Sequence, residues 1–165
     1  MMNQQTDKPT NRTSYGASYT YRNLDVWERA QTLAVQVIPL ARKLPRDPGM
    51  AEIARQLVGS SGSIGANIAE GHGRFTRRAY ANHLNIAKGS ASEVGSWLDL
   101  LRRLGEIDGV LESQLQLEVD SLSGLLKHKI RTLLAEDSKA KPTSIRESSA
   151  NYGTSDDDDT PVEDF

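Results

Sequence analysis

Residues 60–71 read SSGSIGANIAEG, a run of small residues inside a segment that otherwise has the apolar spacing of a helix. Gly59, Gly62 and Gly65 all fall in this predicted helix. A glycine in a helix interior costs about 1 kcal/mol relative to alanine. A chain that keeps three of them must gain from close approach of backbones, so we expect this helix to pack tightly against its neighbours.

Apolar residues on both sides of this stretch recur at intervals of three and four, which is the period of an amphipathic helix. The pattern predicts helices over about 23–44, from about 48 to a stop at Gly71 or Gly73, over 77–104 and over 110–136. Asn23, Thr76 and Asp108 are suitable N-caps. No alternating strand pattern occurs. The sequence therefore predicts an all-α, antiparallel, up-down four-helix bundle with short loops.

Both ends of the chain differ in composition from this central part. Residues 1–21 are polar and without periodicity, and residues 137–165 are rich in Ser, Lys and Asp and include Asp156–Asp159. We expect disordered tails at 1–21 and 137–165 around a folded domain at 22–136. The total charge of −2 combines a net +3 over residues 22–135 with a net −6 over 136–165. The acidic tail is either a solubilising appendage or a phosphate mimic that folds back on basic side chains.

The composition also limits where the protein works. The sequence has no cysteine, so disulfides and thiolate zinc sites are excluded and a reducing compartment is expected. It has no apolar run of about 18 residues that could span a bilayer, and no secretion signal at its start. We therefore expect a cytoplasmic protein with no membrane partner.

The predicted third helix carries two adjacent apolar seams, whereas a helix that packs only inside its own bundle needs one. The second seam mixes apolar residues with Ser90 and Glu93, a composition typical of interfaces. Wrapping of this helix by its own bundle is the alternative. We favour a homo-oligomer. The interface candidates are His83, Ile86, Trp97 and Leu100.

Three motifs together resemble the 23S ribosomal RNA intervening-sequence protein family, also called the S23 family. Residues 21–27 read YRNLDVW; Ser63-Ile64 is followed by NIAEG at 67–71 and by Arg74; residues 87–90 read AKGS, followed by Glu93. The resemblance covers about residues 21–135, and Gly65 stands where the family usually has proline. It implies a structural or assembly role for the matching positions, which are Ser63, Asn67, Glu70, Gly71, Gly89, Ser90 and Glu93.

The resemblance also implies an assembly and a class of partners. Members of the family are small bundles, some encoded inside insertions in ribosomal RNA genes, and no enzymatic activity attaches to them. Their barrel-like homopentamers resemble the accessory variability protein of diversity-generating retroelements, which associates with a reverse transcriptase and with nucleic acid through a basic surface. A homopentamer is thus implied, with RNA, DNA or a reverse transcriptase as candidate partners.

Asn67, Glu70 and Arg74 lie at intervals of three and four, so they share one side of the predicted second helix and its end. These side chains can grip a ligand, or they can hold the fold together. We favour the structural interpretation, in which Glu70 pairs with Arg74 or caps the amides of the following turn, and the Asn67 amide crosses to a neighbouring helix.

The densest basic cluster is the run RFTRR at residues 74–78. Guanidinium groups and free amides at a helix start suit phosphates, and an aromatic ring can stack on a base. The alternative is a solvated face with intrahelical pairs, such as Asp99 with Arg102 or Arg103. The candidate nucleic-acid contacts are Arg74, Arg77, Arg78, Lys88, Arg102 and Arg103.

Catalysis finds little support in the sequence. The three histidines are scattered, no His-Glu-x-x-His motif occurs, and phosphate-loop and dinucleotide fingerprints are missing. We expect no catalytic residues, no metal and no cofactor. The sequence favours a non-enzymatic oligomeric scaffold that associates with RNA or other nucleic acid, or that is accessory to a nucleic-acid enzyme such as a reverse transcriptase. The alternative is a protein-interaction module without nucleic-acid binding.

Overall fold

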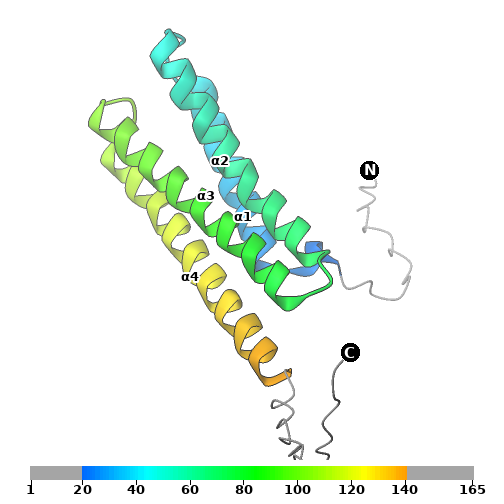
Figure 1. Cartoon of the computed structure of the whole chain (residues 1–165). Coiled ribbons are helices and arrows are strands. Elements are labelled where there is room, and N and C mark those ends of the chain that lie inside the picture. The colour runs from blue at the N-terminus through cyan, green and yellow to red at the C-terminus, as the bar shows by residue number, and fades with distance from the viewer. Residues whose placement is uncertain (1–19, 141–165) are drawn as a thin grey trace, which may run out of the picture.

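Four helices follow one another in the computed structural model, which describes residues 20–140. A short 3-10 turn at Tyr21–Asn23 precedes α1 (Asp25–Lys43), α2 (Pro48–His72), α3 (Arg77–Arg103) and α4 (Gly109–Ala140). Consecutive helices run in opposite directions and are joined at alternate ends of the molecule (Figure 1). Residues 20–140 contain no strand. The predicted all-α antiparallel four-helix bundle is confirmed.

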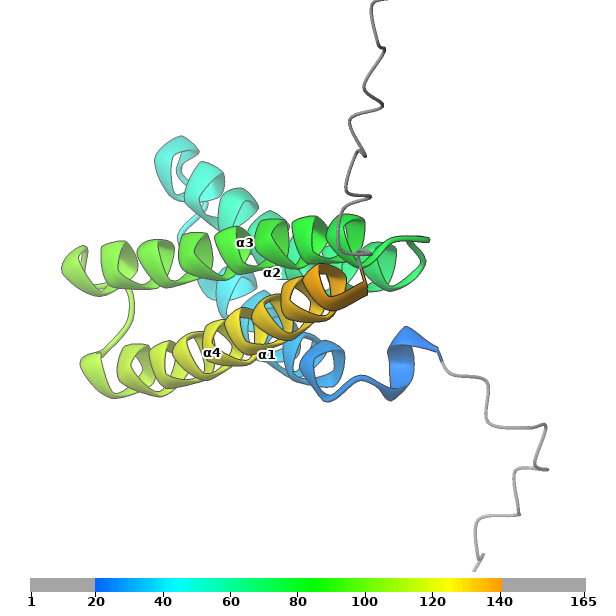
Figure 2. The ribbon, with the colours of Figure 1, turned by 60° about the horizontal axis from the view of Figure 1, so that its bottom comes forward.

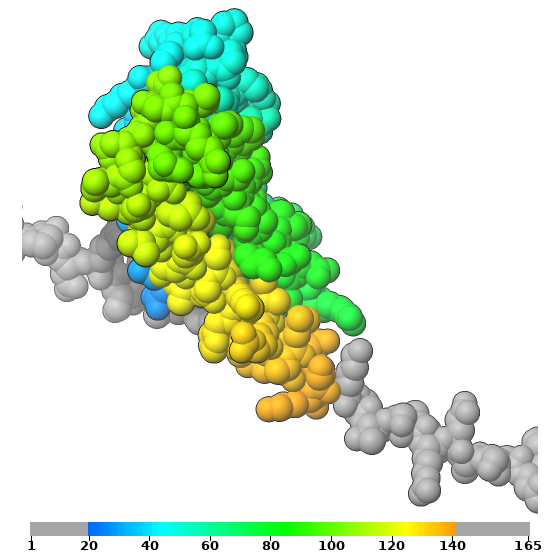
Figure 3. Space-filling view, turned by 90° about the vertical axis from the view of Figure 1, so that its left-hand side faces the viewer, coloured from blue at the N-terminus to red at the C-terminus, as the bar shows by residue number. Residues whose placement is uncertain are grey.

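The four helices are arranged as two pairs that cross at an angle. α3 packs along both α2 and α4, whereas α1 packs mainly on α2 and meets α4 over a much smaller area. The α1–α2 pair crosses the α3–α4 pair, so the α1–α2 and α3–α4 loops diverge at one end (Figures 1 and 2). In Figure 3, the face turned to the viewer is formed mostly by α3 and α4.

The first apolar seam of α3 is the centre of the core. Leu84, Ala87, Ala91, Val94, Leu98 and Leu101 are all completely buried. Leu57, Ile64 and Ile68 of α2 and Leu115, Leu122 and Leu126 of α4 are buried as well. Burial of each of these large side chains stabilises the fold by about 1.5–3 kcal/mol. The spacing of three and four in the sequence therefore identified the core side of these helices.

Side-chain caps define the starts of three helices. The Thr76 hydroxyl accepts from Ala79 N at 3.1 Å, and the Asp108 carboxylate accepts from Leu111 N at 2.8 Å, which confirms both predicted caps. Asp47 accepts from the first-turn amides of α2 at 3.0 and 3.1 Å. The prediction of Asn23 as the cap of α1 is wrong, because Asn23 belongs to the 3-10 turn and Leu24 occupies the cap position.

α3 ends at a glycine with positive φ, and α4 runs further than predicted. Gly105 has a φ of 77° and ends α3: its amide donates to the Arg102 carbonyl at 3.1 Å and that of Glu106 to the Leu101 carbonyl at 3.0 Å. This is the Schellman pattern, for which glycine is favoured. α4 continues to Ala140, four residues beyond the predicted end at 136. The predicted disordered tails, 1–21 and 137–165, overlap the described part at both ends. There the prediction is wrong, because Tyr21 lies in the 3-10 turn and residues 137–140 are helical. Residues 1–19 and 141–165 of these tails lie outside the described part.

The expected role of the glycine run in packing is correct for one of its three glycines. Gly59 and Gly62 are exposed, and a Cβ atom at either would have no neighbour within 4 Å. Gly65 is buried, and a Cβ there would collide with the Gln31 amide of α1. The Gln31 amide is the end of a flexible side chain, whereas the neighbour of Gly71 is close to the backbone. A Cβ at Gly71 would lie 2.7 Å from the Cβ of His83. Close approach of helices is therefore concentrated at single glycines.

Candidate nucleic-acid interface

The turn between α2 and α3 carries the basic cluster that the sequence singled out. We call residues 74–78 the arginine turn. Phe75 is completely exposed, and Arg77 and Arg78 are the first two residues of α3. The first amides of a helix have no acceptor within it, and its dipole makes this end positive. Side-chain and backbone charge therefore have the same sign at this turn.

An open surface pocket of about 520 Å³ adjoins the arginine turn. Its walls combine two aromatic rings, two guanidinium groups, two hydroxyl groups and one carboxylate from the end of α4. Such groups can hold a phosphate and an unpaired base at once. The lining residues are Arg74, Phe75, Thr76, Arg77, Tyr80 and Asp137.

The three arginines of the turn differ in their partners. Arg74 forms an ion pair with Glu70, which confirms the predicted Glu70–Arg74 pair. Arg77 Nε donates to Glu136 Oε2 of α4 at 3.2 Å. Arg78 is exposed and forms no ion pair with any residue between 20 and 140. It is therefore the arginine most available to an anion.

His83 lies beneath the turn and helps to hold Arg74. The Nε atom of Arg74 donates to His83 Nε2 at 3.0 Å, so this ring nitrogen acts as the acceptor. The Nδ1 atom of His83 is buried and points toward Glu70 Oε2, 3.9 Å away. Glu70, Arg74 and His83 thus form a clasp between the end of α2 and the first turns of α3.

The prediction that the Asn67 amide crosses to a neighbouring helix is wrong. Asn67 Nδ2 donates to the carbonyl and hydroxyl oxygens of Ser63, at 2.8 and 3.0 Å, within α2 itself. Its short side chain reaches the preceding turn of its own helix first. The crossing is made by Ser90 Oγ of α3, which lies 3.1 Å from Ser63 Oγ. These motif residues join α2 to α3.

Two other motif positions, Gly89 and Glu93, form no hydrogen bond between α2 and α3. Gly89 is exposed, with no atom within 4 Å of where a Cβ would lie. Glu93 is exposed and accepts a long hydrogen bond of 3.4 Å from Trp97 Nε1. Neither residue forms part of the pocket beside the arginine turn.

The six basic candidates do not form one surface. Arg102 and Arg103 lie at the opposite end of α3, about 36 Å from Arg78 at 1.5 Å per residue. Both pair with Asp99, at 3.5 and 2.6 Å, which confirms the predicted intrahelical pairs. The hydrogen bond from Arg103 is the main cause of the lowered pKa of Asp99. Lys88 is half-buried in the middle of the helix.

The second seam of α3 is only partly covered by its own bundle. Ser90 is buried, and His83, Trp97 and Leu100 are half-buried. Ile86 is 52% exposed and Leu104 is 51% exposed. The bundle thus leaves an apolar strip on α3 open along part of its length, and its use as an interface stays a prediction.

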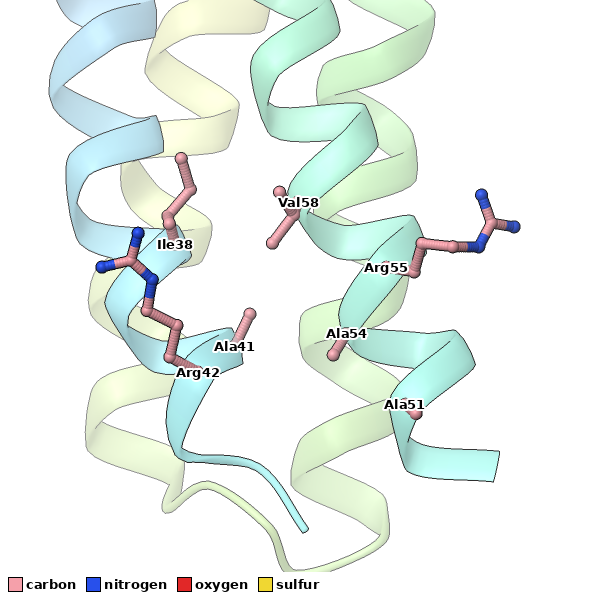
Figure 4. Close-up of a pocket in the computed structure, with 7 residues that line it drawn as sticks. All are labelled: Ile38, Ala41, Arg42, Ala51, Ala54, Arg55 and Val58. Carbon is pink, nitrogen blue, oxygen red and sulfur yellow. The ribbon is translucent and has the colours of Figure 1, made fainter. Parts of the chain in front are cut away.

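A second open pocket, of about 440 Å³, lies between α1 and α2. Figure 4 shows Ile38 and Ala41 of α1 facing Ala54 and Val58 of α2. The charged groups of Arg42 and Arg55 lie at its outer edges. No set of titratable side chains converges inside it, so this groove offers apolar surface rather than chemistry.

Within residues 20–140, no three His, Asp or Glu side chains are placed to hold a metal ion. Among the helices described, none is long and apolar enough to cross a bilayer.

Several contacts of this region could not be identified from sequence spacing. The Arg77–Glu136 and Ser63–Ser90 bonds join residues far apart in the chain, and so does the close approach of Gly95 to Gln116, where a Cβ would lie 2.9 Å from Nε2. In the sequence, these contacts were indicated only by small or charged residues on the sides of the helices that face each other.

The protein is thus a small antiparallel helical bundle. The Ser63–Ser90 and Arg74–His83 hydrogen bonds connect α2 and the turn after it to α3. The chain belongs to the 23S rRNA-intervening sequence protein family, whose model matches residues 22–128. A similar crystal structure is that of a protein of unknown function from the S23 ribosomal protein family of Bacteroides thetaiotaomicron VPI-5482. It is 30% identical, with a TM-score of 0.60, and the match covers 64% of this chain and 97% of that one. No curated protein matches the chain.

Proposed function

We propose that this protein is a non-enzymatic, oligomeric helical scaffold that binds RNA or other nucleic acid through the arginine turn. The observation that carries the proposal is the position of Phe75, completely exposed and flanked by arginines at the positive end of α3. A fully exposed phenylalanine contributes nothing to the core. Beside guanidinium groups it suits an unpaired base with its phosphate.

The assembly belongs to the same proposal. One turn carries three arginines, a small footprint for nucleic acid, and a homo-oligomer would repeat it around a ring. The exposed strip on α3 around Ile86 and Leu104 is the surface that we assign to contact between copies. By the family resemblance, the oligomer is a pentamer and its work is accessory to a nucleic-acid enzyme such as a reverse transcriptase.

Fluorescence anisotropy with a labelled single-stranded RNA tests the binding. We expect Arg78→Ala and Phe75→Ala each to weaken binding, and the affinity of the parent protein to fall steeply between 50 and 200 mM salt, as expected when phosphates are neutralised. Arg55→Ala is the matched control, since it removes an exposed arginine of α2 that is already paired with Glu52. Equal binding by Arg78→Ala and the parent protein would disprove the role of the turn.

A protein-interaction module without nucleic-acid binding is the second candidate. It is favoured by the carboxylate partners of the basic candidates, because Arg74, Arg77, Arg102 and Arg103 all have one. In that case the second seam of α3 serves assembly alone. An oligomer that binds no RNA at 50 mM salt would favour this candidate.

A further inference from the structure

The C-terminal end of α4 lies beside the arginine turn. Figures 2 and 3 show the orange end of α4 next to the green start of α3. The contact is chemical as well as spatial: Glu136 accepts from Arg77 at 3.2 Å, and Asp137 lines the same pocket as Arg74 and Phe75. One carboxylate at the end of α4 already binds this basic surface and a second one lines its pocket, and the chain continues beyond Ala140.

The continuation carries a strong negative charge. Residues 141–165 contain seven acidic side chains against two basic ones, and four consecutive aspartates stand at 156–159. Successive carboxylates resemble a phosphate backbone to an arginine, because guanidinium forks bind both groups in the same way. Arg78 has no ion-pair partner within residues 20–140, and each arginine has five N–H donors.

We propose that Asp156–Asp159 dock on the arginine turn of the same chain and compete there with nucleic acid. The docking is inferred from the position of the end of α4 and from the opposite charges of the aspartates and the arginine turn. It does not depend on nucleic-acid binding. The competition rests on the proposed function, since it requires that the turn binds nucleic acid.

Chain length favours this surface over the basic groups at the other end of the bundle. Fifteen residues separate Ala140 from Asp156. A fully flexible chain of fifteen residues has an average end-to-end distance of about 19–23 Å. The basic residues at the α1–α2 loop and at the end of α3 lie at the far end of α4, which is 32 residues or about 48 Å long. Tethering beside the turn gives the aspartates a local concentration on the order of millimolar.

A distance measurement tests the docking without any RNA. The chain has no cysteine, so spin labels can be placed on the full-length protein through Asn82→Cys, one turn beyond Arg78, and Thr160→Cys, next to Asp159. We expect a short-distance population at low salt by pulsed electron resonance. It should disappear when Asp156–Asp159 are all changed to Asn, and it should persist when labelled protein is diluted with unlabelled protein.

Two outcomes of this measurement would overturn the docking. One is an identical distance distribution for the aspartate and asparagine chains. The other is loss of the short distance on dilution, which would place the contact between copies. A second label pair, Ser113→Cys with Thr160→Cys, reports the far end of α4 and should give only long distances.

RNA binding by the full-length chain tests the competition. With all four aspartates changed to Asn, we expect roughly tenfold tighter binding of single-stranded RNA at about 50 mM salt, and little difference at high salt. The matched control changes four carboxylates elsewhere, namely Glu106→Gln, Glu112→Gln, Glu118→Gln and Asp120→Asn, which alters net charge equally. Equal tightening by both sets, or by neither, would overturn the competition.

The RNA and distance measurements together separate RNA binding by the arginine turn from competition by Asp156–Asp159. If no variant binds RNA, the proposed function fails and so does the competition, while the distance measurement still decides the docking. If RNA binds the arginine turn with the same affinity in the parent and asparagine chains, the proposed function stands and the competition fails.

Discussion

Single residues fix how closely α2 approaches its neighbours. Gly71 is buried where α2 meets α3, and a Cβ there would lie 2.7 Å from the Cβ of His83 and 2.8 Å from Cδ2 of Tyr80. The Cβ of His83 cannot move without its backbone. At Gly59, on the exposed side of the same helix, the space is open. The same residue type therefore has opposite consequences at two positions of one helix.

The first prediction compares these two glycines. Gly71→Ala should lower the free energy of unfolding by about 1–3 kcal/mol, because the added methyl group forces α2 and α3 apart. Gly59→Ala should raise it by up to about 1 kcal/mol, because alanine favours the helix. Urea denaturation followed by circular dichroism measures both. Equal stability of the two variants would show that Gly71 is not a packing contact.

The second prediction concerns a carboxylate of α2. A bidentate hydrogen bond from Arg55, with a further bond from Gln56, lowers the pKa of Glu52 to about 2. Because the folded pKa lies below the ordinary 4.5, any stabilisation by Glu52 is complete above pH 4.5 and is lost as the pH falls toward 2. Arg55→Met should raise the pKa toward 4.5 in an NMR titration. Arg103→Met, which removes a distant arginine, should leave it unchanged.

Among the secondary-structure elements, a few capping side chains determine where the helices begin. Asp47 satisfies two amides at the start of α2 and is followed directly by Pro48, which needs no amide acceptor. Thr76 and Asp108 have the same function in α3 and α4. At α1, the preceding 3-10 turn replaces a side-chain cap.

The third prediction tests the cap of α2. Asp47→Ala should lower the free energy of unfolding by about 0.5–2 kcal/mol, since it leaves the amides of Gly49 and Met50 without this acceptor. Asp47→Asn should retain most of the stability, because its side-chain carbonyl can still accept. Chemical denaturation of the three proteins gives the comparison, and equal losses for both variants would assign the effect to charge rather than to capping.

On the scale of the whole molecule, α3 is the central helix. It packs against α2 and α4 and also presents Ile86 and Leu104 to the outside. Val35 of α1 and Leu117 of α4 are exposed as well, but on other helices. Ile86 and Leu104 are thus the large apolar side chains that the central helix leaves exposed.

The fourth prediction follows from the proposed oligomer. The Tm should rise with protein concentration, because association stabilises only the folded chain. Ile86→Glu should abolish this dependence and leave the helical signal intact. Val35→Glu, an equally polar change at a site 71% exposed on α1, should preserve it. A Tm that stays constant in the parent protein over a hundredfold range of concentration would contradict assembly through the exposed strip on α3.

Sequence patterns predicted the features that depend on near neighbours along the chain. The period of three and four identified the helices and the buried residues of α3, and Thr76 and Asp108 marked the starts of α3 and α4. The Glu70–Arg74 and Asp99–Arg103 pairs were also predictable, because residues four apart meet on one side of a helix.

Only the tertiary structure decided which helix surfaces meet. It placed Gly71 rather than Gly59 in a close contact, joined Ser63 to Ser90, and brought Glu136 of α4 to Arg77. Local spacing fixes the side of a helix on which a residue lies. The crossing of the two helix pairs determines its neighbours, and that crossing depends on packing along the whole bundle.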